Sequence, residues 1–148
     1  MKNIVILGAG FGGLRATLQI CKKLEKLNLS EEYRIVLVDR ESHHTFTPLI
    51  YEIATELRNS ADISKLKSLV VYPLSEILKD KKVEIIKDDV LHLDIKEGLV
   101  HLKKTKMNFD YLVLALGSEM NYFDILGLKE NSLTFKGLRD AVAIRNTL

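Results

Sequence analysis

Near the amino terminus an aliphatic run opens directly into a cluster of glycines, and this feature constrains the fold more than any other. Ile4 to Leu7 is a continuous β-branched and aliphatic segment, which is the pattern of a strand buried on both faces of a parallel sheet. Gly8, Gly10 and Gly13 follow at once, and apolar residues then recur at helical spacing up to Leu27. The sequence therefore predicts a strand, a tight turn and a helix from about Gly13 to Leu27.

The glycines fit the pattern G-x-G-x-x-G, in which each glycine has its own physical role. Gly8 permits the tight turn, Gly10 lets the backbone approach a pyrophosphate, and Gly13 lets the helix pack closely on the strand. The positive end of the helix and its unbonded N–H groups attract phosphate. The alternative is a glycine-rich turn without a ligand, and the strand and helix that flank the motif disfavour it.

A second buried strand, Ile35 to Val38, ends at Asp39 and completes a strand–helix–strand unit. A carboxylate at this position accepts hydrogen bonds from an adenosine ribose and repels a 2′-phosphate, so the pattern disfavours NADP. The alternative role of Asp39 is to cap a turn. Arg40, beside it, either stacks on adenine or faces solvent. We predict that Asp39 binds ribose, because it is paired with the glycine motif.

The rest of the chain divides into shorter elements. Residues 40 to 59 have little regular pattern and are predicted to form a loop, and two short helices divided by Pro73 are predicted between residues 62 and 79. Strands are predicted at Val83–Ile86, Val90–Ile95, Leu99–Leu102 and Phe109–Leu114, the last three as an antiparallel meander, with Tyr111–Gly117 also fitting a buried strand and Leu138–Leu148 a final helix.

Composition and spacing exclude several classes of function. The net charge of +2 is too small to indicate a nucleic-acid or anionic-membrane partner. The single cysteine, Cys21, removes intrachain disulfides and dithiol redox centres, and its helical spacing predicts a small core residue. His43 and His44 are adjacent and lack nearby ligands at metal-site spacing, so no metal site is predicted. No secretory or membrane-spanning segment is evident, and we expect a cytoplasmic chain.

Three segments together resemble a known family. They are Val5–Leu14, Asp39-Arg40 followed by His43–Thr55, and Phe109–Ser118 with Asn121–Phe123 after it. The first and third resemble two-dinucleotide-binding flavoproteins in general, that is, the FAD-dependent pyridine nucleotide-disulfide oxidoreductase superfamily. The second, from His43 to Thr55, is similar to a loop of type II NADH:quinone oxidoreductases and narrows the resemblance to that family.

The resemblance implies an α/β fold: a Rossmann-like, three-layer FAD/NAD(P)-binding domain with a parallel sheet and an antiparallel β-meander. It also implies FAD as the cofactor, held by the following residues. Gly8, Gly10, Phe11, Gly12 and Gly13 would hold the pyrophosphate, Asp39 and Arg40 the adenosine, Thr47 and Pro48 the flavin end, and Val90 the adenine through its backbone, while Ala115 and Gly117 would close over the phosphates. His44 either bonds within its loop or faces the ligand. No catalytic residue is assigned within this chain.

In the family, NADH passes a hydride to the flavin, which then reduces quinone. Residues 1–148 correspond to the N-terminal part of the FAD-binding domain, and the NADH-binding, quinone and membrane-associated parts are expected in a longer protein. We therefore expect an inactive fragment of an enzyme that sits at the cytoplasmic face of the membrane when complete; a homodimer is one arrangement open to it. The alternatives are a ferredoxin reductase or sulfide:quinone oxidoreductase, and a stand-alone, non-catalytic nucleotide-binding module.

Overall fold

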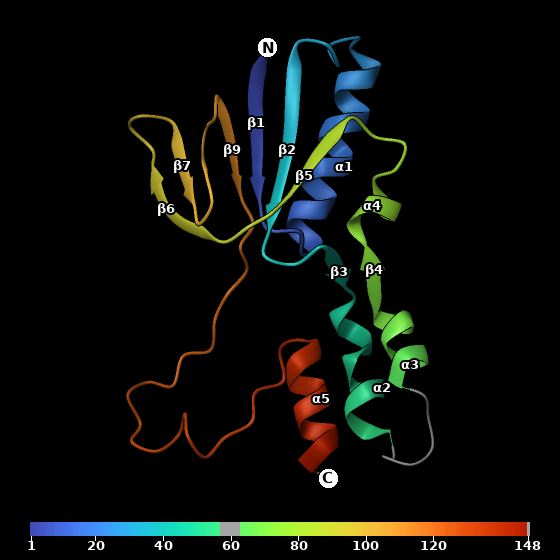
Figure 1. Ribbon diagram of the computed structural model, residues 1–148, viewed down its shortest axis with the longest axis vertical. Coiled ribbons are helices and arrows are strands. Elements are labelled where there is room, and N and C mark those ends of the chain that lie inside the picture. The colour runs from blue at the N-terminus through green and yellow to red at the C-terminus, as the bar shows by residue number, and fades with distance from the viewer. Residues whose placement is uncertain (57–62, 148) are drawn as a thin grey trace. The chain divides into compact units, whose positions relative to one another are not determined.

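The computed structural model describes residues 1–56 and 63–147, and within these it separates into two compact units (Figure 1). The first unit comprises residues 1–44 and 73–117, and the second comprises residues 45–72 and 118–148. The short strands β3 (His43–Thr45) and β4 (Val71–Pro73) form a two-stranded sheet, and the chain changes from one unit to the other within these two strands.

The first unit is built on a parallel sheet with the strand order β5-β2-β1-β9. Its strands are β1 (Lys2–Leu7), β2 (Tyr33–Asp39), β5 (Val83–Lys87) and β9 (Tyr111–Leu114). Ile4 of β1 lies opposite Ile35 on one side and Tyr111 on the other. Because all four strands run the same way, their carboxyl ends meet at one edge of the sheet, where ligands of such folds bind.

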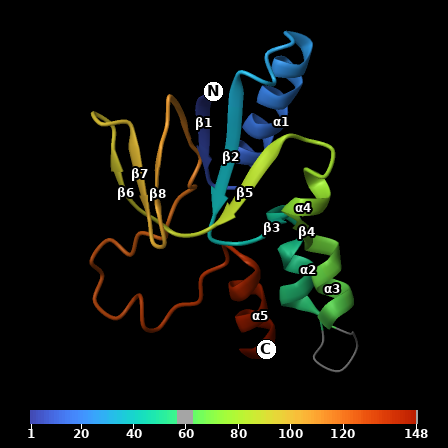
Figure 2. The same cartoon turned by 45° about the horizontal axis from the view of Figure 1, so that its top comes forward.

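Each face of this sheet is covered by a different layer. Helix α1 (Phe11–Lys26) covers one face, and the antiparallel meander of β6 (Val90–Asp94), β7 (Leu99–Leu102) and β8 (Lys106–Asn108) covers the other (Figure 2). Alternate side chains of β1 pack against the two layers. Ile4 and Ile6 pack with α1, while Val5 and Leu7 pack with the meander. The three-layer, Rossmann-like prediction is confirmed, since a strand buried on both faces needs cover on both.

Two predictions about the carboxyl-terminal strands were wrong in detail. Phe109–Leu114 is not a strand of the meander, because the chain leaves the meander at Phe109 and joins the parallel sheet at Asp110. The Phe109 N–H donates to the Gly98 carbonyl and the Asp110 N–H to the Asn3 carbonyl. Nor is β9 fully buried: it is the edge strand, and Tyr111 and Leu114 are 48% and 57% exposed.

The first unit also contains the short helix α4 (Leu74–Ile77), whose Leu74 joins the core beneath α1. The second unit contains the 3-10 helix η1 (Thr47–Leu49) and the helices α2 (Ile50–Thr55), α3 (Ile63–Val70) and α5 (Leu138–Thr147). The predicted helices before and after Pro73 and at the end of the chain are confirmed.

The predicted loop over residues 40–59 was wrong where β3, η1 and α2 form. Ile50, Ile53 and Ala54 of α2 pack with Ala141 of α5, and a helix of six residues depends on such packing rather than on its own propensity. Residues 57–59 of that prediction lie outside the described residues. Arg145 of α5 is buried, and its Nε donates to the Glu56 carbonyl at 3.3 Å.

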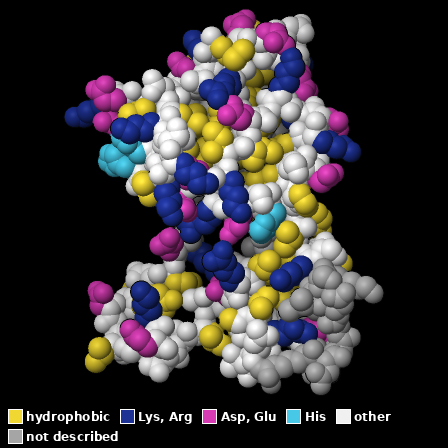
Figure 3. Space-filling model, in the orientation of Figure 1, with side chains coloured by type: hydrophobic (Ala, Val, Ile, Leu, Met, Phe, Trp, Pro, Cys, Tyr) yellow, Lys and Arg dark blue, Asp and Glu magenta, His cyan; other side chains and the backbone are white. Residues whose placement is uncertain are grey.

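On the first unit, basic and acidic side chains are interspersed over the face that Figure 3 presents. Within residues 1–56 and 63–147, no helix has the length and apolar character needed to cross a membrane.

Candidate functional site

The carboxyl ends of β1, β2 and β9 bring three predicted residues together. The Gly8 N–H, just after β1, donates to the Val38 carbonyl of β2 at 2.8 Å. The Ala115 N–H, just after β9, donates to the Leu7 carbonyl at 2.8 Å. Asp39 ends β2, so Gly8, Asp39 and Ala115 lie along the same edge of the sheet. The candidate site is this edge together with the amino end of α1.

Gly8 and Gly13 are required by close backbone packing. Gly8 has a φ of +99°, and a Cβ added there would lie 2.2 Å from the Ala115 carbonyl oxygen. A Cβ added at Gly13 would lie 1.7 Å from the Gly8 carbonyl oxygen. Neither contact is possible for a real side chain. The turn and the close helix–strand packing predicted for these two glycines are therefore confirmed as geometry.

Gly10 stands in open space, unlike Gly8 and Gly13. It is the N-cap of α1, and a Cβ built on it would meet no atom within 4 Å. Gly10, Phe11 and Gly12 are all exposed, the N-cap makes no side-chain hydrogen bond, and the first turn carries no acidic residue. The positive end of a 16-residue helix therefore faces solvent without a carboxylate of its own to neutralise it.

Asp39 is partly buried, and both of its oxygens accept backbone hydrogen bonds. Oδ2 accepts from the Ala9 N–H at 2.6 Å, and Oδ1 accepts from the Glu41 N–H at 2.8 Å. A carboxylate has about four lone-pair positions, so each oxygen keeps capacity for a further donor such as a hydroxyl. The turn-capping role that the sequence left open is thus present, and it leaves room for a ribose contact.

His44 is 6% exposed and contacts the glycine loop rather than its own loop. Its Nδ1 lies 2.9 Å from the Ala9 carbonyl oxygen, and its ring meets the Phe11 ring edge-on, with 4.8 Å between the centroids. Sequence reasoning missed Ala9 altogether. No signal in the sequence points to it, because both of its partners come from segments far along the chain.

The other predicted residues take different positions. Arg40 is exposed at the end of β2. The Asp88 N–H donates to the Asp39 carbonyl at 2.9 Å, which brings the start of β6, and so Val90, to the same sheet edge.

Ala115 packs against the glycine loop, and Gly117 two residues later is exposed with a φ of +80°. Thr47 and Pro48 belong to the second unit, where both are exposed in η1.

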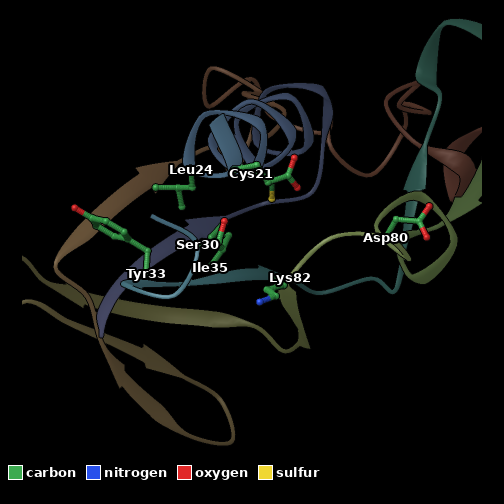
Figure 4. Close-up of a pocket in the computed structure, with 8 residues that line it drawn as sticks. Cys21, Leu24, Ser30, Tyr33, Ile35, Asp80 and Lys82 are labelled. Carbon is green, nitrogen blue, oxygen red and sulfur yellow. The ribbon is translucent and has the colours of Figure 1, made fainter. Parts of the chain in front are cut away.

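A cavity of about 220 Å³ lies elsewhere in the first unit, at the amino ends of β2 and β5 (Figure 4). It is lined by Cys21, Leu24, Glu25, Ser30, Tyr33, Ile35, Asp80 and Lys82. Cys21 is a buried core residue, as predicted, and burial followed by the charge of Glu25 raises the pKa of its thiol. The cavity shares no residue with the glycine loop, and a buried, protonated thiol is a poor nucleophile.

The sequence pattern of the pyridine nucleotide-disulphide oxidoreductase family matches residues 2–148. The chain therefore belongs to this family.

Known proteins similar to the chain include a type II NADH:quinone oxidoreductase, Ndh, of Mycobacterium tuberculosis, which is 30% identical over 152 residues. That match covers 99% of this chain and 29% of the relative, so the chain spans about three tenths of the length of this relative.

Two solved structures share the fold. NDH2 of Plasmodium falciparum, in complex with NADH, aligns with a TM-score of 0.78 at 22% identity over 97% of this chain and 28% of the other. The sulfide:quinone oxidoreductase of Aquifex aeolicus aligns with a TM-score of 0.77 at 24% identity over 99% of this chain and 31% of the other.

Proposed function

We propose that the chain is the FAD-binding part of an NADH:quinone oxidoreductase. The observation that carries the proposal is the open amino end of α1 at Gly10, set against the carboxylate of Asp39 on the same sheet edge. This arrangement fits a ligand with a diphosphate beside a ribose that lacks a 2′-phosphate. The membership of the oxidoreductase family and the similarity to Ndh support FAD and the quinone reaction.

The residues fit FAD in the following way. The backbone N–H groups of Gly10, Phe11, Gly12 and Gly13 would receive the diphosphate, because Gly10 leaves open space for it. Asp39 would accept hydrogen bonds from the ribose hydroxyls, with Arg40 beside it, and His44 would support the loop. The remaining contacts within the first unit would come from Val90 to adenine through its backbone, and from Ala115 and Gly117 over the phosphates.

When bound, FAD would supply the redox chemistry, hydride acceptance from NADH and electron transfer to quinone. The contribution of this chain is to bind and orient the adenine half of the cofactor. We propose that residues 1–148 form the N-terminal part of the FAD-binding domain, and that NADH, quinone and the membrane meet parts of a longer protein. On this proposal the chain alone is inactive and binds FAD weakly.

Binding measurements on the chain test the cofactor assignment. We expect ADP and FAD to bind competitively and the 2′-phosphate analogue of ADP to bind at least about tenfold more weakly, because Asp39 would repel it. Equal binding of the 2′-phosphate form, or no binding of ADP, would contradict the proposal. In a longer protein that contains this chain, reduction of quinone by NADH but not by sulfide separates the proposed activity from that of a sulfide:quinone oxidoreductase.

A further inference from the structure

Ala9 is held on both sides by side chains that come from elsewhere in the chain. Its N–H donates to Asp39 Oδ2 at 2.6 Å, and its carbonyl oxygen lies 2.9 Å from His44 Nδ1. The two partners lie 30 and 35 residues further along the sequence. Ala9 itself is 3% exposed, so neither of these backbone groups can be satisfied by bulk water.

The position of Ala9 makes this arrangement important for the loop. It stands between Gly8, which has a φ of +99°, and Gly10, the N-cap of α1. Glycines have the greatest conformational freedom of any residue, so a loop of this composition keeps its shape only through its contacts. A rotation of either peptide plane of Ala9 would redirect the backbone at Gly10, where the loop is open to a ligand.

The contact also shows that Nδ1 of the His44 ring carries a proton. A carbonyl oxygen can only accept, so His44 Nδ1 must carry the proton, either in the neutral Nδ1–H tautomer or in the imidazolium form. The ring is 6% exposed and packs edge-on against Phe11, which follows Gly10 in the loop. The side chain is therefore fixed in position as well as in hydrogen bonding.

We propose that Asp39 and His44 act together as positioning residues that clamp Ala9, and that the clamp aims the glycine loop at a bound diphosphate. The inference rests on the proposed nucleotide site and adds a second role to Asp39, besides any contact with ribose. It assigns His44 to the loop rather than to direct contact with the cofactor.

The decisive ligand is 2′,3′-dideoxy-ADP, which keeps the diphosphate and lacks the ribose hydroxyls. Asp39→Ala should lower the affinity of the chain for this analogue about tenfold, because a charged hydrogen bond to the loop is lost. Asp39→Asn should retain most of the affinity, since its amide oxygen still accepts from Ala9. If Asp39 acted on ribose alone, neither substitution would weaken the binding of the dideoxy analogue.

At His44 the two matched substitutions are His44→Asn and His44→Phe. An asparagine amide nitrogen takes the place of Nδ1 and can donate to Ala9, whereas phenylalanine keeps a ring against Phe11 without a donor. We expect His44→Phe to lower the affinity about tenfold and His44→Asn to lower it less. Asp39→Ala combined with His44→Phe should lose clearly less than the product of the two single effects, because both contacts hold the same residue, Ala9, one through each of its flanking peptide planes. Independent, multiplying losses would overturn the clamp.

Nitrogen NMR of the wild-type chain tests the clamp without any variant. We expect the His44 Nδ1 signal to be that of a protonated nitrogen at every pH at which the chain is folded, and the Ala9 amide to resist hydrogen exchange. A proton on Nε2 with Nδ1 bare, or a rapidly exchanging Ala9 amide, would overturn the inference even if ADP binds normally. Failure of the wild-type chain to bind ADP would instead contradict the proposed function and leave these signals intact.

Discussion

The two ends of the parallel sheet in the first unit differ in what they offer a ligand. At the carboxyl end the glycine loop exposes the positive end of α1, with no acidic residue in the first turn. At the amino end Lys23 and Lys26 occupy the last turn of α1 and offset its negative end, and Lys81 pairs with Glu25 beside the cavity at 3.1 Å. The first turn of α1 thus carries no charged side chain to offset its positive end, whereas two lysines in the last turn offset its negative end.

On the proposed function, the cavity at the amino end is not the nucleotide site. The amino-end cavity is lined by a protonated thiol, apolar side chains and charged groups, of which Glu25 already pairs with Lys81. The carboxyl end offers backbone donors at a helix terminus, which attract a diphosphate without a deep pocket. Four predictions test this comparison of the two ends of the sheet, through the stability of the fold and the binding of ADP.

The largest effect is expected from Gly13→Ala. The added Cβ would lie 1.7 Å from the Gly8 carbonyl oxygen, so the helix must move away from the strand. We expect the free energy of unfolding to fall by about 3 kcal/mol or more, measured by denaturant titration. Gly12→Ala is the control, because its Cβ would meet only the Ala115 side chain at 3.9 Å. Equal stability of the two variants would show that the packing at Gly13 is not tight.

Gly10→Ala should separate binding from stability. Its Cβ would meet no protein atom and its φ of −68° is open to alanine, so the free energy of unfolding should fall by no more than about 1 kcal/mol, the cost of alanine in place of glycine at an N-cap. The methyl group would occupy the space proposed for the diphosphate, and we expect the affinity for ADP to fall about tenfold or more, as measured by calorimetry. Unchanged affinity would place the diphosphate somewhere else.

Cys21 tests whether the cavity at the amino end admits a reagent from solvent. Burial, and then the charge of Glu25, raise the pKa of its thiol, although Lys81 opposes this. A pKa that is higher in the folded chain stabilises the fold below the pKa of the unfolded thiol, and this contribution is lost as the pH rises through the folded value. Since thiolate is the reactive form, a disulfide reagent at pH 8 should react about tenfold more slowly with the folded chain than with the chain in guanidinium. Similar rates would mean that the cavity is open to the reagent.

The smallest effect is expected from the ion pair of Lys81 and Glu25. The two side chains are 30% and 50% exposed, and such pairs contribute about 0–1 kcal/mol. Lys81→Met should therefore change the free energy of unfolding by less than about 1 kcal/mol and leave ADP binding unchanged. A double-mutant cycle with Glu25→Gln measures the pair itself. A clear loss of ADP affinity in Lys81→Met would contradict the inference that the amino end of the sheet takes no part in binding.

Much of the first unit was predictable because its strands are continuous aliphatic runs and its turn is marked by glycines. The errors arose where neighbours rather than local pattern decide the structure. Phe109–Leu114 is apolar apart from Asp110, and only its partners Gly98 and Asn3 show where the meander ends and the sheet begins. Helix α2 was missed because six residues carry too little periodicity, and its packing against α5 comes from distant sequence.

The sequence by itself determined the buried strands, the glycine turn and the carboxylate at the end of β2, because each depends on a pattern contained within a few adjacent residues. Only the tertiary structure decided that Gly10 faces open space while Gly13 has none, and that Asp39 and His44 meet at Ala9. The physical reason is that a hydrogen bond between residues 30 or 35 positions apart depends on how the sheet aligns its strand ends and where the chain runs after β2. No local pattern encodes that path.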